Sequence, residues 1–195
     1  MHKYSIDAGL LRGAQQLPSP NFNLRPANCP IELLVIHNIS LPAGEFSGGY
    51  IQSFFQNRLD HTVHPSFSEL KDLQVSAHLL ITREAEVVQF VNFNSRAWHA
   101  GVSNYKNRDN CNDFSIGIEL EGADNCSFTA AQYQVLAQIS ALLQQHYPQI
   151  NTRSTVGHSD IAPGRKTDPG PCFDWQQYRR LWSESMPTNE CKDND

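Results

Sequence analysis

The sequence has no apolar run close to the ~18 consecutive residues that mark a membrane-spanning helix, and it has no excess of positive charge. Its 195 residues include 15 Lys and Arg against 20 Asp and Glu, which gives a formal net charge of −5. Duplex nucleic acid requires a basic protein face. Only 18% of the residues are charged, which disfavours a disordered polyelectrolyte. The sequence therefore predicts a globular protein with neither a nucleic-acid nor a membrane partner.

The cysteines form no CxxC pair, and their number, five, is odd. The first twenty residues lack an apolar stretch followed by a small-residue cleavage site, so no secretory signal is expected. Unpaired thiols without a signal are typical of a reducing compartment. We therefore expect a cytoplasmic protein with free cysteines.

Several common catalytic signatures are also missing. There is no GxSxG elbow of a serine hydrolase, no HExxH motif of a zinc protease and no HxE…PCxxC motif of a deaminase. The segment GEFSGG does not have GxGxxG spacing, and PGRKTD lacks the upstream glycines of a phosphate-binding loop. These absences favour a metal site built from dispersed histidines and acids.

The segments with the pattern of β-strands are residues 32–36, 77–82, 86–92 and 114–121. The first is an apolar run that ends at His37 and is typical of a strand buried on both faces. The second and third are separated by a short polar turn, which predicts a hairpin. The fourth, FSIGIELE, alternates and places Glu119 on a polar face.

Helices are predicted over residues 50–58, from the capping box Thr129-x-x-Gln132 to about 147, and after Asp174. Strands interspersed with helices predict an α/β fold in which a central mixed β-sheet is flanked by helices. We expect a single domain over residues 1–186, which begins with an extended lead-in over 1–30. A polar tail, 187–195, is expected to follow it.

Two of the eight histidines have contexts suited to metal binding. His37 ends a buried strand, and His158 opens GHSDIAPGRKTDPG, a segment dense in ligand types and in rigid Pro and Gly. A catalytic zinc takes three protein ligands and keeps one position open. Asp160 and Asp168 both fit as the third ligand, and Cys172 is a more remote candidate. Residue types alone do not choose between the two aspartates.

Five motifs together resemble the zinc-dependent N-acetylmuramoyl-L-alanine amidases, most closely the cytoplasmic branch that acts on 1,6-anhydromuropeptides. The motifs are LLVIHNIS (33–40), VSAHLLI (75–81), RAWHAGVS (96–103), NDFSIGIELEG (112–122) and GHSDIAPGRKTDPGPCFDW (157–175). The resemblance extends in order from about Gly9 to Trp182. It implies a zinc hydrolase that acts on a linear amide.

The resemblance also implies a role for particular residues. One Zn²⁺ per chain would be held by His37, His158 and Asp168. Glu119 would be the catalytic acid and base, and Lys166 would stabilise the developing oxyanion.

With Asp168 as the ligand, Asp160 is left with a supporting role. The residues expected along the substrate are Asn38, Trp98, His99 and Arg165.

The implied reaction is cleavage of the amide between the lactyl group of anhydro-N-acetylmuramic acid and the L-alanine of the stem peptide. Its implied setting is cell-wall recycling in the cytoplasm, with an effect on β-lactamase induction through muropeptide levels. Two alternatives are a periplasmic amidase of intact peptidoglycan and a non-catalytic muropeptide-binding module. Binding modules of this kind usually lack a zinc ligand, whereas all three ligand positions are filled here.

Overall fold

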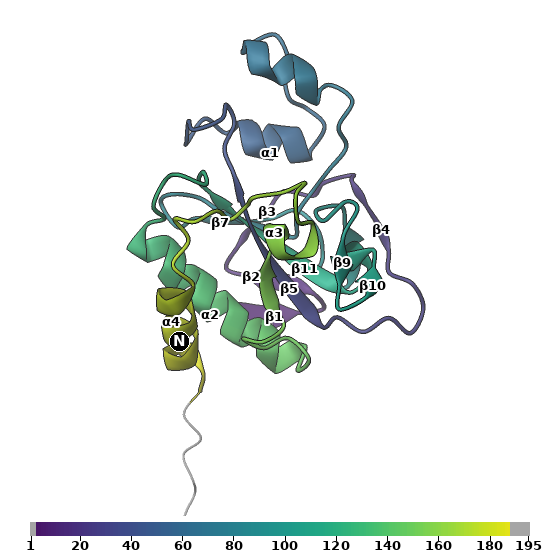
Figure 1. Cartoon of the computed structure of the whole chain (residues 1–195), viewed down its shortest axis with the longest axis vertical. Coiled ribbons are helices and arrows are strands. Elements are labelled where there is room, and N and C mark those ends of the chain that lie inside the picture. The colour runs from purple at the N-terminus through teal and green to yellow at the C-terminus, as the bar shows by residue number, and fades with distance from the viewer. Residues whose placement is uncertain (1–2, 188–195) are drawn as a thin grey trace, which may run out of the picture.

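The computed structural model describes residues 3–187, and its centre is a six-stranded sheet in the order β12–β5–β11–β6–β7–β3 (Figure 1). These strands are β12 (Thr155–Gly157), β5 (Leu33–Ile39), β11 (Ser115–Glu121), β6 (Leu79–Ile81), β7 (Val87–Gln89) and β3 (Gln15–Gln16). Strands β12, β5, β11 and β6 run parallel, whereas β6 and β7 form an antiparallel hairpin. The predicted mixed sheet and the predicted hairpin are confirmed.

Helices cover both faces of this sheet. Helices α2 (Ala130–His146) and α4 (Trp175–Ser185) lie side by side on one face (Figure 1) and share one apolar core with β5, β6 and β11. On the other face, α1 (Tyr50–Phe55) and the 3₁₀ turn Pro65–Leu70 pack on side chains of β6 and β7. In the described residues, no helix is long and apolar enough to cross a membrane.

The predicted helix starts are confirmed at atomic detail. Thr129 Oγ1 accepts from the Gln132 N–H at 3.1 Å, and Gln132 Oε1 accepts from the Thr129 N–H at 3.0 Å, which completes the capping box of α2. Asp174 caps α4 by accepting from the Gln177 N–H. The first helix is shorter than expected, because Asn57, with φ of 57°, ends it in the left-handed conformation.

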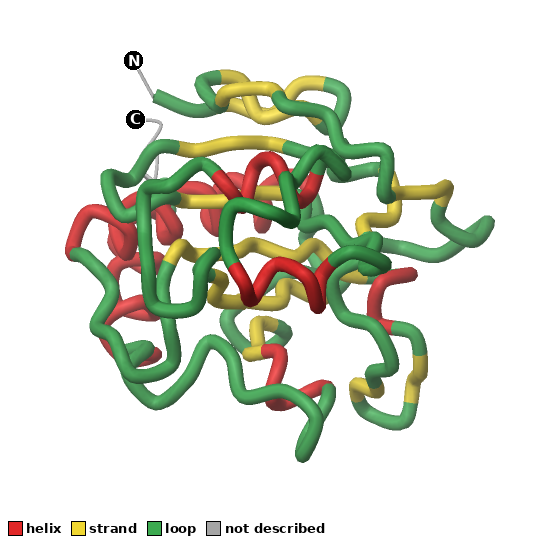
Figure 2. The backbone as a smooth tube through the Cα atoms, turned by 90° about the horizontal axis from the view of Figure 1, so that it is seen from above, coloured by secondary structure: helices red, strands yellow, loops and turns green. Residues whose placement is uncertain are grey.

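The lead-in forms short strands within its described part. Figure 2 shows several of these strands among long connecting loops. The smaller pairs are β1 (Ser5–Asp7) with β2 (Leu10–Arg12), β4 (Phe22–Leu24) with β8 (Ser95–Ala97), and β9 (Asn104–Tyr105) with β10 (Arg108–Asp109). Most of the expected polar tail lies outside the described residues, and the single-domain boundary at 186 stays a prediction.

The two hairpin strands are shorter than expected, at Leu79–Ile81 and Val87–Gln89, and two further strands differ in length or burial. Strand β5 continues through His37 to Ile39, because β11 pairs with it along its whole length. The face of β11 that carries Glu119 was expected to be polar, yet every residue of β11 is buried. Strand β11 lies inside the sheet between β5 and β6, so its polar side chains face the interior instead of solvent.

Arg25 joins the lead-in to the start of β11. Its guanidinium donates to the backbone oxygens of Asn112, Asp113, Phe93 and Ser115 at 2.8–3.1 Å. Burial lowers the pKa of Arg25 to about 10, so the group stays charged at neutral pH. One cation therefore supplies a hydrogen bond to each of four backbone carbonyl groups.

Replacing Arg25 by methionine should lower the free energy of unfolding by about 3 kcal/mol, because part-buried carbonyls lose a charged donor. Urea unfolding measures the change. Arg12→Met is the matched control: its guanidinium pairs with the exposed Asp7, and such pairs contribute about 0–1 kcal/mol. Equal midpoints for the two variants would contradict the role of Arg25.

Candidate functional site

The C-terminal ends of three parallel strands meet at one edge of the sheet. His37 on β5 pairs in register with Glu119 on β11, so the two side chains leave the sheet on the same face. Gly157 of β12 pairs with Ile36, which brings the following residue, His158, beside His37. Ligand sites of α/β sheets form at such strand ends.

Three side chains from distant parts of the chain converge there. His37 Nδ1 lies 3.0 Å from His158 Nδ1 and 2.9 Å from Asp168 Oδ2, and His158 Nδ1 lies 3.1 Å from the same carboxylate oxygen. Within residues 3–187, this is the one group of three or more His, Cys, Asp or Glu side chains with ligand atoms this close. We call it the His/His/Asp group.

The segment after β12, which begins with the short helix α3 (His158–Ile161) and continues as a loop, explains why Asp168 returns to the histidines. The Ser159 N–H donates to the Asp168 carbonyl oxygen at 3.0 Å, which ties the two ends of the loop together. Gly157 makes room for the return, because a Cβ there would lie 2.7 Å from Pro169 Cδ. Asp160 points elsewhere: its carboxylate accepts from the Gly157 N–H at 2.7 Å. Of the two acids that the residue types left open, the structure brings Asp168 to the histidines.

The His/His/Asp group fits a zinc ion. Zinc bonds of about 2.0–2.1 Å in a tetrahedral site separate neighbouring ligand atoms by about 3.4 Å, so a small outward shift of these three atoms admits the ion. Burial lowers the pKa of His37 to about 4, which leaves the imidazole neutral, as ligation requires. Burial alone raises the pKa of Asp168, but the hydrogen bonds of His158 and His37 outweigh it and hold the carboxylate ionised. The group therefore offers the neutral imidazole of His37 and the anionic carboxylate of Asp168, with the His158 ring beside them.

Glu119 is a buried carboxyl beside this group. It is 9% exposed, and within residues 3–187 its Oε2 atom has no hydrogen-bond partner. Burial raises its pKa well above the usual value, and the charge of Asp168 adds to that rise, whereas Lys166 opposes it. A carboxyl with a raised pKa next to a candidate metal site is suited to proton transfer.

A hollow of about 580 Å³ opens over Asp168. Predicted residues along it are Asn38, Arg165 and Lys166, and both cationic side chains are exposed. Trp98 and His99 do not line it: Trp98 donates its indole N–H to Asn23, and His99 lies between His37 and Ser115. The substrate contacts expected of Trp98 and His99 stay predictions.

The loop after β11 also lines this hollow and was not anticipated from the sequence. Asp124 in this loop accepts from the Asn38 amide at 2.7 Å. Its place directly after a predicted strand is the signal that could have identified it, because such loops surround the sites of α/β sheets.

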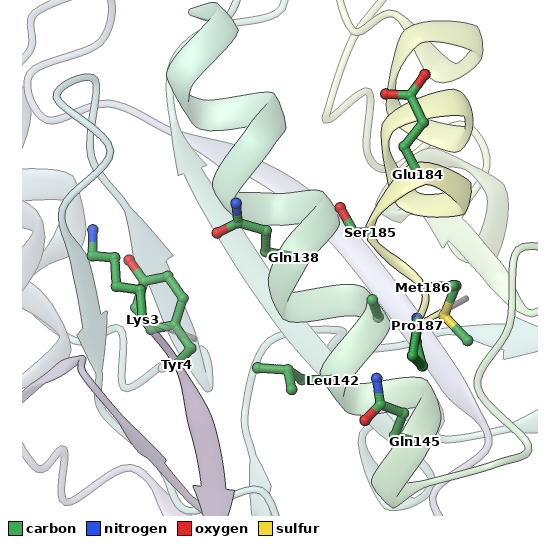
Figure 3. A pocket seen from close by; sticks show the side chains of 10 residues that line it. Lys3, Tyr4, Gln138, Leu142, Gln145, Glu184, Ser185, Met186 and Pro187 are labelled. Atoms are coloured by element: carbon green, nitrogen blue, oxygen red, sulfur yellow. The ribbon is translucent and has the colours of Figure 1, made fainter. Parts of the chain in front are cut away.

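A second hollow, of about 780 Å³, lies between β1, α2 and α4 (Figure 3). Its walls include Gln138 and Leu142 of α2, Glu184 of α4, and Lys3 and Tyr4. None of its lining residues belongs to the His/His/Asp group or faces Glu119. The candidate metal ligands lie at the smaller hollow over Asp168, which is therefore the candidate site.

Comparison with known proteins agrees with this geometry. A family model described as N-acetylmuramoyl-L-alanine amidase matches residues 27–171, a segment that contains the whole His/His/Asp group and Glu119. The 1,6-anhydro-N-acetylmuramyl-L-alanine amidase AmpD of Escherichia coli (strain K12) is 53% identical over 179 residues, which cover 92% of this chain and 97% of that protein.

Solved structures have the same fold. A crystal structure of a selenomethionine derivative of AmpD superposes with a TM-score of 0.88 at 52% identity, covering 90% of this chain and 98% of that one. The E. coli amidase AmiD, solved in complex with the substrate anhydro-N-acetylmuramic acid-L-Ala-D-γ-Glu-L-Lys, superposes with a TM-score of 0.58 at 29% identity. That match covers 91% of this chain and 65% of the AmiD chain. Since the family model and a relative of more than half identity both extend over most of its length, the chain belongs to the N-acetylmuramoyl-L-alanine amidase family of hydrolases.

Proposed function

We propose that this chain is a zinc amidase that cleaves the bond between the lactyl group of 1,6-anhydro-N-acetylmuramic acid and the L-alanine of its stem peptide. The convergence of His37, His158 and Asp168 beside the buried Glu119 is the observation that carries the proposal. The names of the relatives support the substrate class, since AmpD is named for the anhydro sugar and AmiD was solved with an anhydromuropeptide.

The site supplies the parts that amide hydrolysis needs. A zinc ion held by His37, His158 and Asp168 would act as a Lewis acid and lower the pKa of water from ~15.7 towards ~7. Glu119 takes a proton from the attacking water and delivers it to the departing alanine nitrogen, a task that its raised pKa suits. Lys166, on the wall of the hollow, places a positive charge where the carbonyl oxygen becomes negative.

The hollow suits a polar substrate, because cations, carboxylates and amides all line it. Arg165 and Lys166 present cations to it, and Asn38 presents an amide. A stem peptide carries free carboxylates and amide groups that pair with such side chains. We propose that these three residues contact the peptide.

Peptide release tests the function. Zinc-loaded protein is incubated with anhydromuropeptide and, separately, with intact sacculi, and the products are followed by mass spectrometry. Release of free peptide from the anhydromuropeptide is the expected result. Release from sacculi would identify the alternative amidase of intact cell wall, and binding without release would identify a non-catalytic module. The cytoplasmic setting and the link to β-lactamase induction stay predictions.

The two acids that follow His158 should behave differently when replaced. Asp168→Ala should lose zinc during dialysis against a mild chelator, because it removes one of three ligands. Asp160→Ala should retain zinc at lower activity, because it removes only the cap on the Gly157 N–H, and losses of supporting hydrogen bonds cost about 10–100-fold. Zinc content after the same dialysis decides; if Asp160→Ala is the variant that empties, the assignment of Asp168 is wrong.

A further inference from the structure

Both histidines of the His/His/Asp group turn the same ring nitrogen towards it. Each contributes Nδ1, so each leaves Nε2 pointing away from the group. The two Nε2 atoms meet consecutive residues of one short segment: His158 Nε2 lies 3.0 Å from the Ala100 carbonyl oxygen, and His37 Nε2 lies 2.9 Å from His99 Nδ1. One segment, residues 98–101, therefore contacts both candidate ligands at the ring nitrogen that points away from the group.

With a metal bound through Nδ1, these contacts assign the hydrogens of the three rings. A histidine that binds a metal through Nδ1 carries its hydrogen on Nε2. His158 then donates to the Ala100 carbonyl, and His37 donates to Nδ1 of His99. With Nδ1 accepting, His99 carries its own hydrogen on Nε2 and donates it to Ser115 Oγ at 3.0 Å. The result is a continuous chain of hydrogen bonds from the metal group to β11.

The position of the His99 ring is set by the strand below it. A Cβ on Gly117 would lie 2.5 Å from Cγ and Nδ1 of His99, so the ring packs directly on the strand backbone where a side chain is missing. Ser115, two residues earlier on the same face of β11, is completely buried and holds the far nitrogen. His99 therefore has one orientation available, and that orientation points Nδ1 at His37.

A buried amide holds the segment itself. Asn112 Oδ1 accepts from the backbone N–H of His99 at 3.1 Å and from that of Ala100 at 2.8 Å. Asn112 is 6% exposed, so both hydrogen bonds are shielded from water. Arg165 donates to the Ala100 carbonyl at 2.7 Å from the other side. The segment is thus fixed independently of the two histidines that it contacts.

We propose that His99 is a positioning residue for the metal site: it accepts the His37 Nε2–H and so holds His37 Nδ1, in the ligating tautomer, towards His158 and Asp168. Asn112 acts one step further away by fixing the segment that also supplies the Ala100 carbonyl to His158. This assignment rests on the proposed zinc function and differs from the substrate contact expected of His99. Loss of such an outer hydrogen bond costs about 10–100-fold in metal affinity.

The test compares two replacements of His99. His99→Leu fills the space but has no acceptor, whereas His99→Asn keeps an oxygen near the position of Nδ1. His61→Leu is the matched control, because its ring also bonds a backbone oxygen, that of Phe67, away from the group. Zinc affinity is measured by competition with a chromogenic chelator. The visible absorption of the Co²⁺-loaded chain then reports the geometry of the metal site.

We expect His99→Leu to bind zinc about 10–100-fold more weakly than the parent, with an altered Co²⁺ spectrum. His99→Asn should recover most of the affinity, and His61→Leu should match the parent. Equal zinc affinity and identical Co²⁺ spectra for the parent and His99→Leu would overturn this inference and leave the proposed function standing. A parent chain that itself binds no zinc would contradict the proposed function instead.

Milder variants cover the case in which His99→Leu does not fold. Ser115→Ala removes a single oxygen at the end of the hydrogen-bond chain, and Asn112→Asp keeps an oxygen that accepts both N–H groups, unlike Asn112→Leu. We expect weaker zinc binding for Ser115→Ala and Asn112→Leu, and near-parental binding for Asn112→Asp. If Ser115→Ala and Asn112→Leu both bind zinc as the parent does, the segment does not position the site.

Discussion

Replacing His37 by alanine should empty the metal site. We expect about one Zn²⁺ per parent chain and almost none in the variant, because a catalytic zinc has only three protein ligands and the change removes one of them. Activity on anhydromuropeptide should fall to background with the metal. Elemental analysis of protein purified without chelators gives the metal content, and His158→Ala should behave in the same way.

The control for this experiment is a histidine outside the group. His64 is half-buried, and its ring bonds to neighbouring Ser66 and lies beside Phe67, away from the group, so His64→Ala should keep both zinc and activity. Circular dichroism of each variant separates loss of metal from loss of fold. A His37→Ala chain that keeps its zinc, or one that is active without metal, would contradict the assignment.

The strand that carries His37 shows which features of the site a local sequence pattern can predict. The apolar run of residues 32–36 was enough to predict a buried strand and to place His37 near its end. The true end at Ile39 is set by pairing with Glu121, more than eighty residues later, which no local pattern records. The same pairing buries Glu119. Its alternation was visible in the sequence, whereas its burial depends on β11 lying inside the sheet.

The third ligand and His99 needed information of a different kind. Residue types left Asp160 and Asp168 equivalent; the resemblance favoured Asp168, and the loop closed by Ser159 is the physical reason why its carboxylate reaches the histidines. The resemblance led us to expect His99 along the substrate. The Trp-His-Ala-Gly sequence around it does not indicate where its ring points. Gly117 and other distant residues orient it towards His37, so only the tertiary structure shows what it contacts.

Glu119→Gln should separate metal binding from catalysis. The amide keeps the size of the carboxyl but neither takes up nor delivers a proton, so activity should fall by about 10²–10⁴-fold, the range of general acid–base catalysis. Zinc content should stay near one per chain, because Glu119 is not a member of the His/His/Asp group. Initial rates with anhydromuropeptide give the activity, and elemental analysis of the same preparation gives the zinc content.

Glu121 on the same strand provides the matched control. It is also buried, but its two oxygens accept backbone N–H groups from Ser47 at 2.6 Å and Arg83 at 3.0 Å, so its carboxylate is already bound within the protein. Glu121→Gln replaces one acceptor by a donor and should lower the urea midpoint, because one of these N–H groups loses its partner. Its effect on the reaction should be much smaller than that of Glu119→Gln, since it carries no proton in the proposed reaction. Loss of zinc from Glu119→Gln in proportion to its loss of activity would instead show that Glu119 is a ligand.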